Sequence, residues 1–230
     1  MKKATLIFSL TLLMLSIGEW SQAQDWPDLS RYKIDNEALG LPLSGETRIV
    51  FMGNSITDNW DNTSPDFFKN RPYINRGISG QTTPQMLVRF RPDVIKLKPE
   101  VVVILAGTND IAGNTGPSTL EMIMDNIISM AQLAQSNGIK VILCSVLPAF
   151  DYSWRPGKNP VEKIPALNAM IKKYADENNI IYLDYYSAMV DERGGLKVEY
   201  TNDGVHPTKV GYDVMEPMVE EAIKKALMKE

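Results

Sequence analysis

The sequence predicts an α/β protein in which one parallel sheet is covered by helices on both faces. Short apolar, β-branched runs alternate with segments of helical spacing along the 230 residues. The run from Val101 to Leu105 is apolar at every position, as expected for a strand buried on both faces. No repeat or linker-like tract interrupts the chain, and its 44% apolar and 23% charged residues are ordinary for one folded domain.

Five strands and five helices are expected in alternation. The strands are apolar runs bounded by Gly, Pro, Asn or Asp: Arg48 to Met52, Tyr73 to Arg76, Val101 to Ala106, Lys140 to Val146 and Ile180 to Asp184. Helical spacing occurs at Pro65 to Lys69, Pro84 to Leu97, Ser118 to Asn137, Val161 to Asn178 and about Thr208 to Lys229. Because strand-helix-strand crossovers are right-handed, this alternation favours a parallel sheet with helices on both sides.

Residues 1–23 are expected to be a secretory signal peptide. Two lysines precede an apolar stretch, and the small residues Ser21 and Ala23 suit the −3 and −1 positions of a cleavage site. The apolar stretch is shorter than the roughly 20 residues that span a bilayer, and no cysteine near the cleavage site would take a lipid. We therefore expect export to the periplasm or the extracellular space without a stable membrane anchor. Residues 24–45 form an N-terminal extension without recognisable chemistry, followed by a domain of residues 46–230.

Charge and cysteine content exclude several classes of protein. The net charge is −4 and no Lys/Arg cluster is present, so neither nucleic acid nor an anionic membrane is expected as a partner. Cys144 is the only cysteine, which rules out an internal disulfide, and its apolar strand favours a packing role. One histidine and one cysteine cannot make a usual Cys/His zinc site, and residues 77–80 lack the pattern of a phosphate loop. No metal and no cofactor is predicted, and the oligomeric state is left open.

The single histidine is the starting point for a mechanism. Histidine is the side chain whose unperturbed charge change falls between pH 5 and 8. His206 follows Asp203 by three positions, so one turn of chain could bring the carboxylate and the imidazole together. The carboxylate would then accept from Nδ1–H, fix the tautomer and leave Nε2 free to take a proton. Pro207 suits the first turn of the last helix.

Three polar clusters follow the first three strands, at the sheet edge where parallel sheets bind ligands. Residues 53–55 place Ser55 at a helix N-terminus, either as a nucleophile among converging N–H groups or as a simple N-cap. Residues 75–83 contain Gly77 and Gly80, which allow close approach of the backbone to a ligand or form a plain turn. Residues 106–110 contain Asn109, either a donor to developing negative charge or a turn former.

The four clusters in this order resemble the SGNH hydrolase family, also called GDSL-like esterases. The family is named for four blocks, and the matching residues are Ser55, Gly80, Asn109 and His206. The resemblance covers most of the chain after the signal. It implies a three-layer α/β/α, flavodoxin-like fold with a five-stranded parallel sheet, and ester hydrolysis without a metal.

The resemblance also implies a role for each site residue. Ser55 would be the nucleophile, His206 the base and then the acid, and Asp203 the orienting carboxylate. The backbone N–H groups of Ser55 and Gly80 and the side chain of Asn109 would form the oxyanion hole. The chain has Asn and Ile at positions 54 and 56, where the family's four-letter name has Asp and Leu, a departure that concerns substrate preference more than chemistry.

Aromatic residues near the expected site point to the substrate. Tyr152 and Trp154 lie in the long irregular segment of residues 148–160, and Trp60 lies just behind the nucleophile. Each could stack on a sugar ring or pack in the core. An exported acidic esterase with such aromatics suggests a carbohydrate O-acetyl esterase acting on a glycan or small-molecule ester. A lysophospholipase and a short-chain acyl-ester or thioester hydrolase are alternatives, and an acyltransferase or a non-catalytic carbohydrate-binding protein are further ones.

Overall fold

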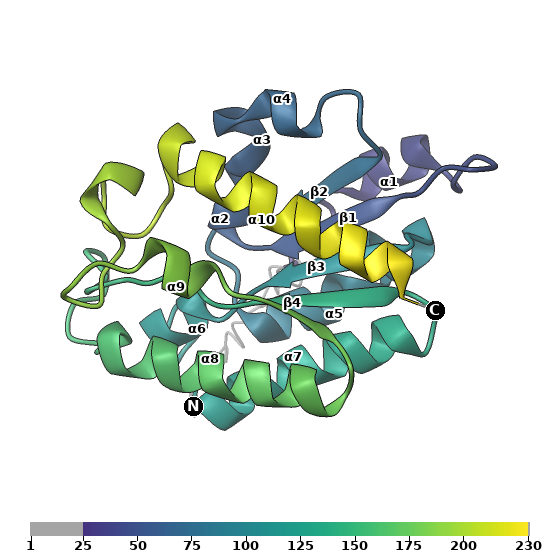
Figure 1. The fold of residues 1–230 in the computed structure, drawn as a ribbon. Helices are drawn as coiled ribbons and strands as arrows, with labels where there is room; N and C mark the ends of the chain where they lie inside the picture. Colours follow the sequence, from purple (N-terminus) through teal and green to yellow (C-terminus); the bar gives the residue numbers. More distant parts are fainter. Residues whose placement is uncertain (1–24, 230) are drawn as a thin grey trace, which may run out of the picture.

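The fold is a five-stranded parallel sheet between two layers of helices (Figure 1). In this computed structural model, residues 25–229 are described, and the predicted signal peptide lies outside them. The strands lie in the order β2-β1-β3-β4-β5, which is the flavodoxin-like order. They are β1 (Ile49–Gly53), β2 (Tyr73–Gly77), β3 (Val101–Leu105), β4 (Lys140–Cys144) and β5 (Ile181–Leu183). The predicted three-layer α/β/α class and its five parallel strands are confirmed.

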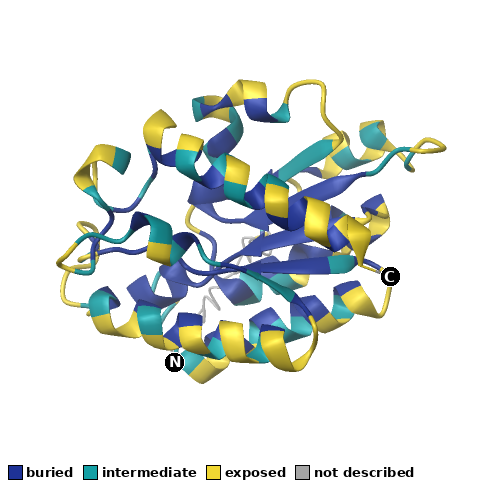
Figure 2. Ribbon diagram, viewed as in Figure 1, coloured by how far each residue is buried: buried dark blue, intermediate teal, exposed yellow. Residues whose placement is uncertain are grey.

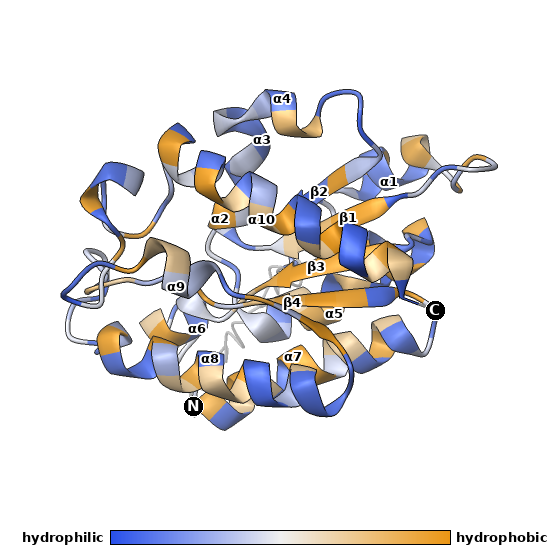
Figure 3. Ribbon diagram, in the orientation of Figure 1, coloured by the Kyte–Doolittle hydropathy of each residue, from blue (hydrophilic) through white to orange (hydrophobic). Residues whose placement is uncertain are grey.

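Alternation along the strands sends side chains into two separate cores. Val50 and Met52 point to one face of the sheet, and Ile49 and Phe51 point to the other. The first face is covered by α5 (Thr83–Asp93), α7 (Leu120–Gln135) and α8 (Pro160–Glu177). The second is covered chiefly by α9 (Tyr185–Met189) and α10 (Lys209–Met228). Figure 2 shows β1, β3 and β4 largely buried and the outer sides of these helices exposed, and Figure 3 shows the matching hydropathy.

The long helices begin and end within a few residues of the predicted bounds, whereas most of the short ones were not predicted. The predicted segment from Pro84 to Leu97 is divided into α5 and a 3-10 turn, η1 (Ile95–Leu97). The short helix α4 (Pro65–Phe68) occurs as predicted, and α2 (Ser55–Asp58) follows the serine. The unpredicted elements are α1 (Lys33–Leu39), α3 (Trp60–Thr63), α6 (Thr108–Ala112), α9 and the 3-10 turn η2 (Val198–Tyr200). These elements are too short to show an apolar period.

The N-terminal extension packs against the domain rather than standing apart from it. The Tyr32 hydroxyl, buried with its ring, donates to the backbone oxygen of Gly77 at the end of β2. Asn36 donates to Asp93 at 2.8 Å and accepts from Arg76 at 2.9 Å. The extension is therefore fixed to β2 and α5, the two elements on either side of the Gly80 loop.

Candidate active site

Two glycines shape the turn that follows β1. A Cβ atom on Gly53 would lie 2.0 Å from Thr57 Oγ1, and one on Gly77 would lie 2.1 Å from the backbone nitrogen of Asp58. Helix α2 can therefore fold back tightly onto the ends of β1 and β2 only because both positions lack a side chain. The turn presents Ser55 as the first residue of α2, with its N–H free of any acceptor within the helix.

Ser55, His206 and Asp203 lie in one chain of hydrogen bonds. The Ser55 hydroxyl is 2.8 Å from His206 Nε2. On the other side of the ring, His206 Nδ1 is 2.6 Å from Asp203 Oδ2. Because a carboxylate only accepts hydrogen bonds, Nδ1 carries the proton and Nε2 of the neutral ring accepts from the serine. The structure thus brings together three side chains drawn from positions up to 151 residues apart.

The turn that carries His206 is held mainly by its own carboxylate. Asp203 Oδ1 accepts from the backbone N–H groups of His206 at 2.8 Å and Val205 at 2.9 Å. Partial burial acts to raise the pKa of Asp203, but hydrogen bonds from the His206 ring and these backbone groups outweigh it and lower the pKa to about 2. Asp203 is therefore an anion at every pH at which histidine can act as a base.

Of the two other residues expected at the oxyanion hole, Gly80 lies on the loop after β2 and Asn109 in the first turn of α6. Gly80 has φ +79°, a left-handed conformation that favours glycine, and a Cβ there would meet no atom within 4 Å. The backbone angle, not crowding, therefore favours glycine at this position. The Asn109 side chain is buried, and its Nδ2 donates to the backbone oxygen of Gln81 at 2.9 Å. Since an amide nitrogen carries two protons, one N–H of Asn109 remains for a ligand.

A buried arginine that the sequence analysis missed connects the end of β1 to the Gly80 loop and to α5. Arg89 has no exposed surface, and its guanidinium donates to Gly53 O at 2.9 Å and to Asp93 Oδ2 at 3.0 Å. Its Nε donates to Oε1 of Gln81. Burial lowers the pKa of Arg89, and the ion pair with Asp93 opposes that shift. A sequence signal existed, because Arg89 and Asp93 stand in the same helical stripe as the buried apolar residues Met86 and Phe90.

A buried carboxyl group lies beside Asn109. Asp110 is 2% exposed, and its Oδ1 accepts from the backbone N–H of Thr83 at 2.9 Å and from the Thr83 hydroxyl at 2.6 Å. Burial raises the pKa of Asp110 to about 6, and the hydrogen bonds from Thr83 only partly offset it. This contact joins α6, which follows β3, to the start of α5.

Of the three aromatic residues expected near the substrate, only Trp154 lies exposed at the site. Its ring centroid is 6.3 Å from that of His206, with 29° between the planes, and the side chain is 40% exposed. Its indole N–H donates to Asn114 Oδ1 at 3.1 Å. Tyr152 is fully buried beneath it and bonded to the Thr108 hydroxyl at 2.9 Å. The prediction that Tyr152 stacks on a sugar is therefore wrong, because no face of its ring is open.

For Trp60, the alternative that it stacks on a sugar is also wrong. It is 1% exposed and stacks on Phe67 and Tyr212, each with its ring centroid 5.1 Å away. Its indole N–H donates to Glu216 at 3.3 Å. Helix α3 turns this side chain beneath α10 and away from the sheet edge that carries Ser55.

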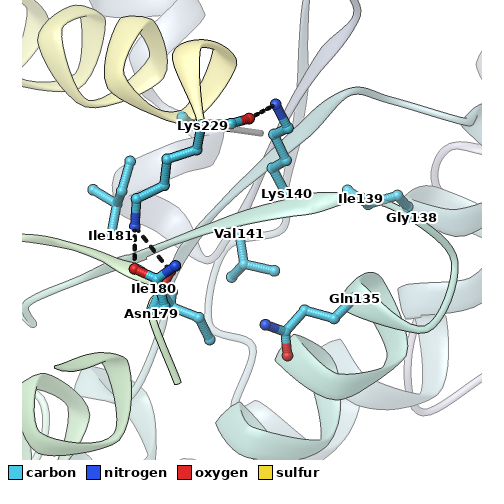
Figure 4. A pocket seen from close by; sticks show the side chains of 10 residues that line it. Gln135, Gly138, Ile139, Lys140, Val141, Asn179, Ile180, Ile181 and Lys229 are labelled. Carbon is cyan, nitrogen blue, oxygen red and sulfur yellow. Dashed lines mark hydrogen bonds between the residues drawn. The ribbon is translucent and has the colours of Figure 1, made fainter. Parts of the chain in front are cut away.

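A separate cavity of about 220 Å³ lies at the opposite end of the sheet (Figure 4). Lys140 and Ile181, the first residues of β4 and β5, line it together with Lys229, which bonds to Asn179 at 2.9 Å. It is remote from the carboxyl ends of the strands and holds none of the candidate site residues. Among residues 25–229, no three or more His, Cys, Asp or Glu side chains are grouped to hold a metal ion. No helix in the same range is long and apolar enough to cross a membrane.

The fold and this site define an ester hydrolase built on a doubly wound parallel sheet. The chain belongs to the GDSL-like Lipase/Acylhydrolase family, whose model matches residues 51–214. The family predicted from the four sequence blocks is thereby confirmed.

Two solved structures and one acetylxylan esterase support this assignment. The chain is 53% identical in sequence to a predicted acylhydrolase of known structure from Bacteroides fragilis, with a TM-score of 0.87, covering 89% of this chain and 99% of that one. A GDSL-like lipase from Bacteroides thetaiotaomicron is 52% identical, with a TM-score of 0.85 and coverage of 87% and 99%. An acetylxylan esterase from Xylanibacter ruminicola is 27% identical over 225 residues, 82% of this chain, which spans 45% of that protein's length.

Proposed function

We propose that this chain hydrolyses carboxylic esters through Ser55, His206 and Asp203, and that its substrates are O-acetylated carbohydrates. The observation that carries the chemistry is the continuous hydrogen-bond chain from the Ser55 hydroxyl through the imidazole to the carboxylate, at 2.8 and 2.6 Å. An adjacent base is what makes a serine hydroxyl nucleophilic at neutral pH.

The reaction proceeds in two halves. Ser55 Oγ attacks the acyl carbonyl while His206 Nε2 takes its proton, and Asp203 stabilises the imidazolium that forms. The oxyanion of the tetrahedral intermediate accepts from the Ser55 and Gly80 N–H groups and the Asn109 amide. His206 then protonates the leaving alcohol, which leaves an acyl-enzyme. Water, deprotonated by His206, attacks the acyl carbon, and His206 then returns the proton to Ser55 Oγ as the acid is released.

Two features support a carbohydrate as the alcohol part of the ester. The exposed Trp154 ring beside His206 offers an apolar face of the kind that stacks on a sugar. The relative from Xylanibacter ruminicola is an acetylxylan esterase. We also propose that the protein is exported, on the basis of the signal-like pattern in residues 1–23.

Hydrolysis of 4-nitrophenyl acetate from pH 5 to 9 tests the chemistry. The wild type is expected to release acetate faster as the histidine loses its proton, and Ser55→Ala should lower kcat by about 10⁴-fold or more. Ser129→Ala, which changes a serine on the outer side of α7 that bonds only its own helix, is the matched control and should keep full activity. Equal rates for Ser55→Ala and the wild type would disprove the proposal.

The substrate class is tested by acetate release from acetylated xylooligosaccharides against fatty-acid release from a lysophospholipid. We expect the acetylated sugar to be the far better substrate by kcat/KM. Faster cleavage of the lysophospholipid would still agree with ester hydrolysis, but it would refute acetylated carbohydrates as the substrates. Transfer of acetyl groups to an added sugar in place of water would identify an acyltransferase.

A further inference from the structure

We propose that residues 25–32 build a sugar-binding subsite next to the reacting ester, with Trp26 as its aromatic platform. The subsite rests on the proposed function, because it would hold the alcohol part of an acetylated glycan. Residues 25–32 lie outside residues 51–214, which match the family model.

A groove of about 510 Å³ runs from the oxyanion loop to this segment. Its lining includes Trp26, Asp28, Gly80, Asn114, Trp154 and Arg155. The volume falls within the range of roughly 300 to 1,000 Å³ found for small-molecule sites. Since Gly80 belongs both to the groove and to the loop of the proposed oxyanion hole, an ester bound at Ser55 would extend directly into the groove. The acetyl group is small, so the part that extends is the alcohol.

The main chain of the segment is fixed to the loop and helix beside Gly80. Gln81 Nε2 donates to the backbone oxygen of Pro27 and Gln85 Nε2 to that of Trp26, both at 2.7 Å. The carboxylate of Asp25 accepts from the N–H groups of Leu29 and Ser30, each at 2.9 Å. The backbone of Trp26 is thus held in place while its indole is left 44% exposed.

The composition of the groove matches a sugar better than an acyl chain. Two exposed indoles, Trp26 and Trp154, line the same groove, with the polar groups of Asp28, Asn114 and Arg155 beside them. Aromatic faces pack against the C–H side of a sugar ring, and polar side chains bond its hydroxyls. A fatty acyl chain would desolvate the charged groups of Asp28 and Arg155 without replacing their hydrogen bonds to water. The occupant we infer is therefore the sugar next to the acetyl ester.

The test compares two substrates in the full chain carrying Trp26→Ala. The ratio of kcat/KM for acetylated xylotriose to kcat/KM for 4-nitrophenyl acetate should fall about tenfold, mainly through KM for the sugar. Trp26→Tyr should restore most of the ratio. Leu43→Ala is the control, because Leu43 is 78% exposed and lies outside the residues that line the groove. The backbone oxygen that holds Gln85 is kept in every variant, so the segment remains anchored.

The outcomes separate the subsite from the esterase. Loss of both activities to the same degree in Trp26→Ala would mean that the segment only supports the oxyanion loop, and would overturn the subsite. An unchanged ratio would overturn it as well. A wild type that cleaves neither substrate would refute the proposed function itself, before the subsite is reached.

Discussion

The two halves of the candidate site differ in how they are held. Ser55 and Asn109 are buried, at 8% and 3% exposed, and the buried Arg89 connects their surroundings. The side chains of His206 and Asp203 are 31% and 47% exposed and are held by a turn of seven residues, 201–207. Apart from the exposed Gly80, the half that would stabilise negative charge is thus buried and fixed, and the half that would move protons is open to water and to the leaving alcohol. Electrostatic stabilisation gains most from a preorganised, water-excluded site.

Because the two halves are held differently, substitutions in them should differ in their effects on activity and stability. Arg89 bonds to Gly53, Gln81 and Asp93, so a change there reaches both the nucleophile turn and the Gly80 loop. Asp203 bonds mainly within residues 201–206. Substitutions in the base half should therefore change activity without changing stability, and those in the nucleophile half should change both.

The base half gives the largest expected effect. Asp203→Asn keeps the shape of the side chain but removes its charge and permits the wrong imidazole tautomer, so kcat should fall by about 10⁴-fold. Thermal unfolding should change little, because the turn is exposed. Asp213→Asn, in an exposed pair with Lys209, is the control and should keep both properties. A loss in kcat below tenfold would show that Asp203 does not orient His206.

The nucleophile half gives the largest effect on stability. Arg89→Met leaves the Asp93 carboxylate buried without its partner, which should lower the free energy of unfolding by about 3 to 5 kcal/mol. Lys173→Met is the matched control, because it breaks an exposed pair with the same i,i+4 spacing and should cost about 0 to 1 kcal/mol. Urea unfolding measures both. Equal losses in the free energy of unfolding for the two variants would contradict the difference in stability between the two halves of the site.

The sequence was sufficient for the fold and for most of the site, for a physical reason. Parallel strands end at one edge, so the polar residues after β1, β2 and β3 must meet there, which brought Ser55, Gly80 and Asn109 to one site. His206 follows no strand directly, and its place 151 positions from Ser55 was expected from the family resemblance. Burial of a single aromatic side chain is decided by tertiary packing, so the sequence left open whether Trp60, close behind Ser55, lines the site or packs in the core, and the structure places it in the core. Arg89 was missed because a charged residue in a helix is ordinarily solvated. The role of the extension at Trp26 depends on contacts that no local pattern reveals.

The amide of Asn109 tests whether the buried half stabilises charge. Asn109→Ala removes the free N–H and should lower kcat by about 10²- to 10³-fold with a smaller change in KM. It also frees the backbone oxygen of Gln81, so unfolding should be measured beside the kinetics. Asn137→Ala, an exposed amide that bonds its own helix, is the control. Wild-type kcat in Asn109→Ala would exclude the amide from the oxyanion hole.

The smallest effect concerns two carboxyl groups whose pKa values move in opposite directions. Hydrogen bonds lower the pKa of Asp203 in the open half to about 2, despite partial burial, whereas burial raises that of Asp110 in the closed half to about 6. Because the folded protein holds the Asp110 proton more tightly than the unfolded chain, whose pKa is near 3.8, this group stabilises the fold fully below pH 3.8. That contribution is lost as the pH rises to about 6.

Replacing Asp110 with its neutral isostere should remove this dependence. Asp110→Asn keeps an oxygen that can accept from Thr83, so the variant should gain stability relative to the wild type between pH 4 and 6.5, by up to about 3 kcal/mol. Urea unfolding of both proteins across that range measures the difference. A difference that is constant with pH would mean that Asp110 is ionised in the folded protein throughout. The hydrogen bonds from Thr83 would then outweigh burial, as those to Asp203 do, and the contrast between the two carboxyl groups would fail.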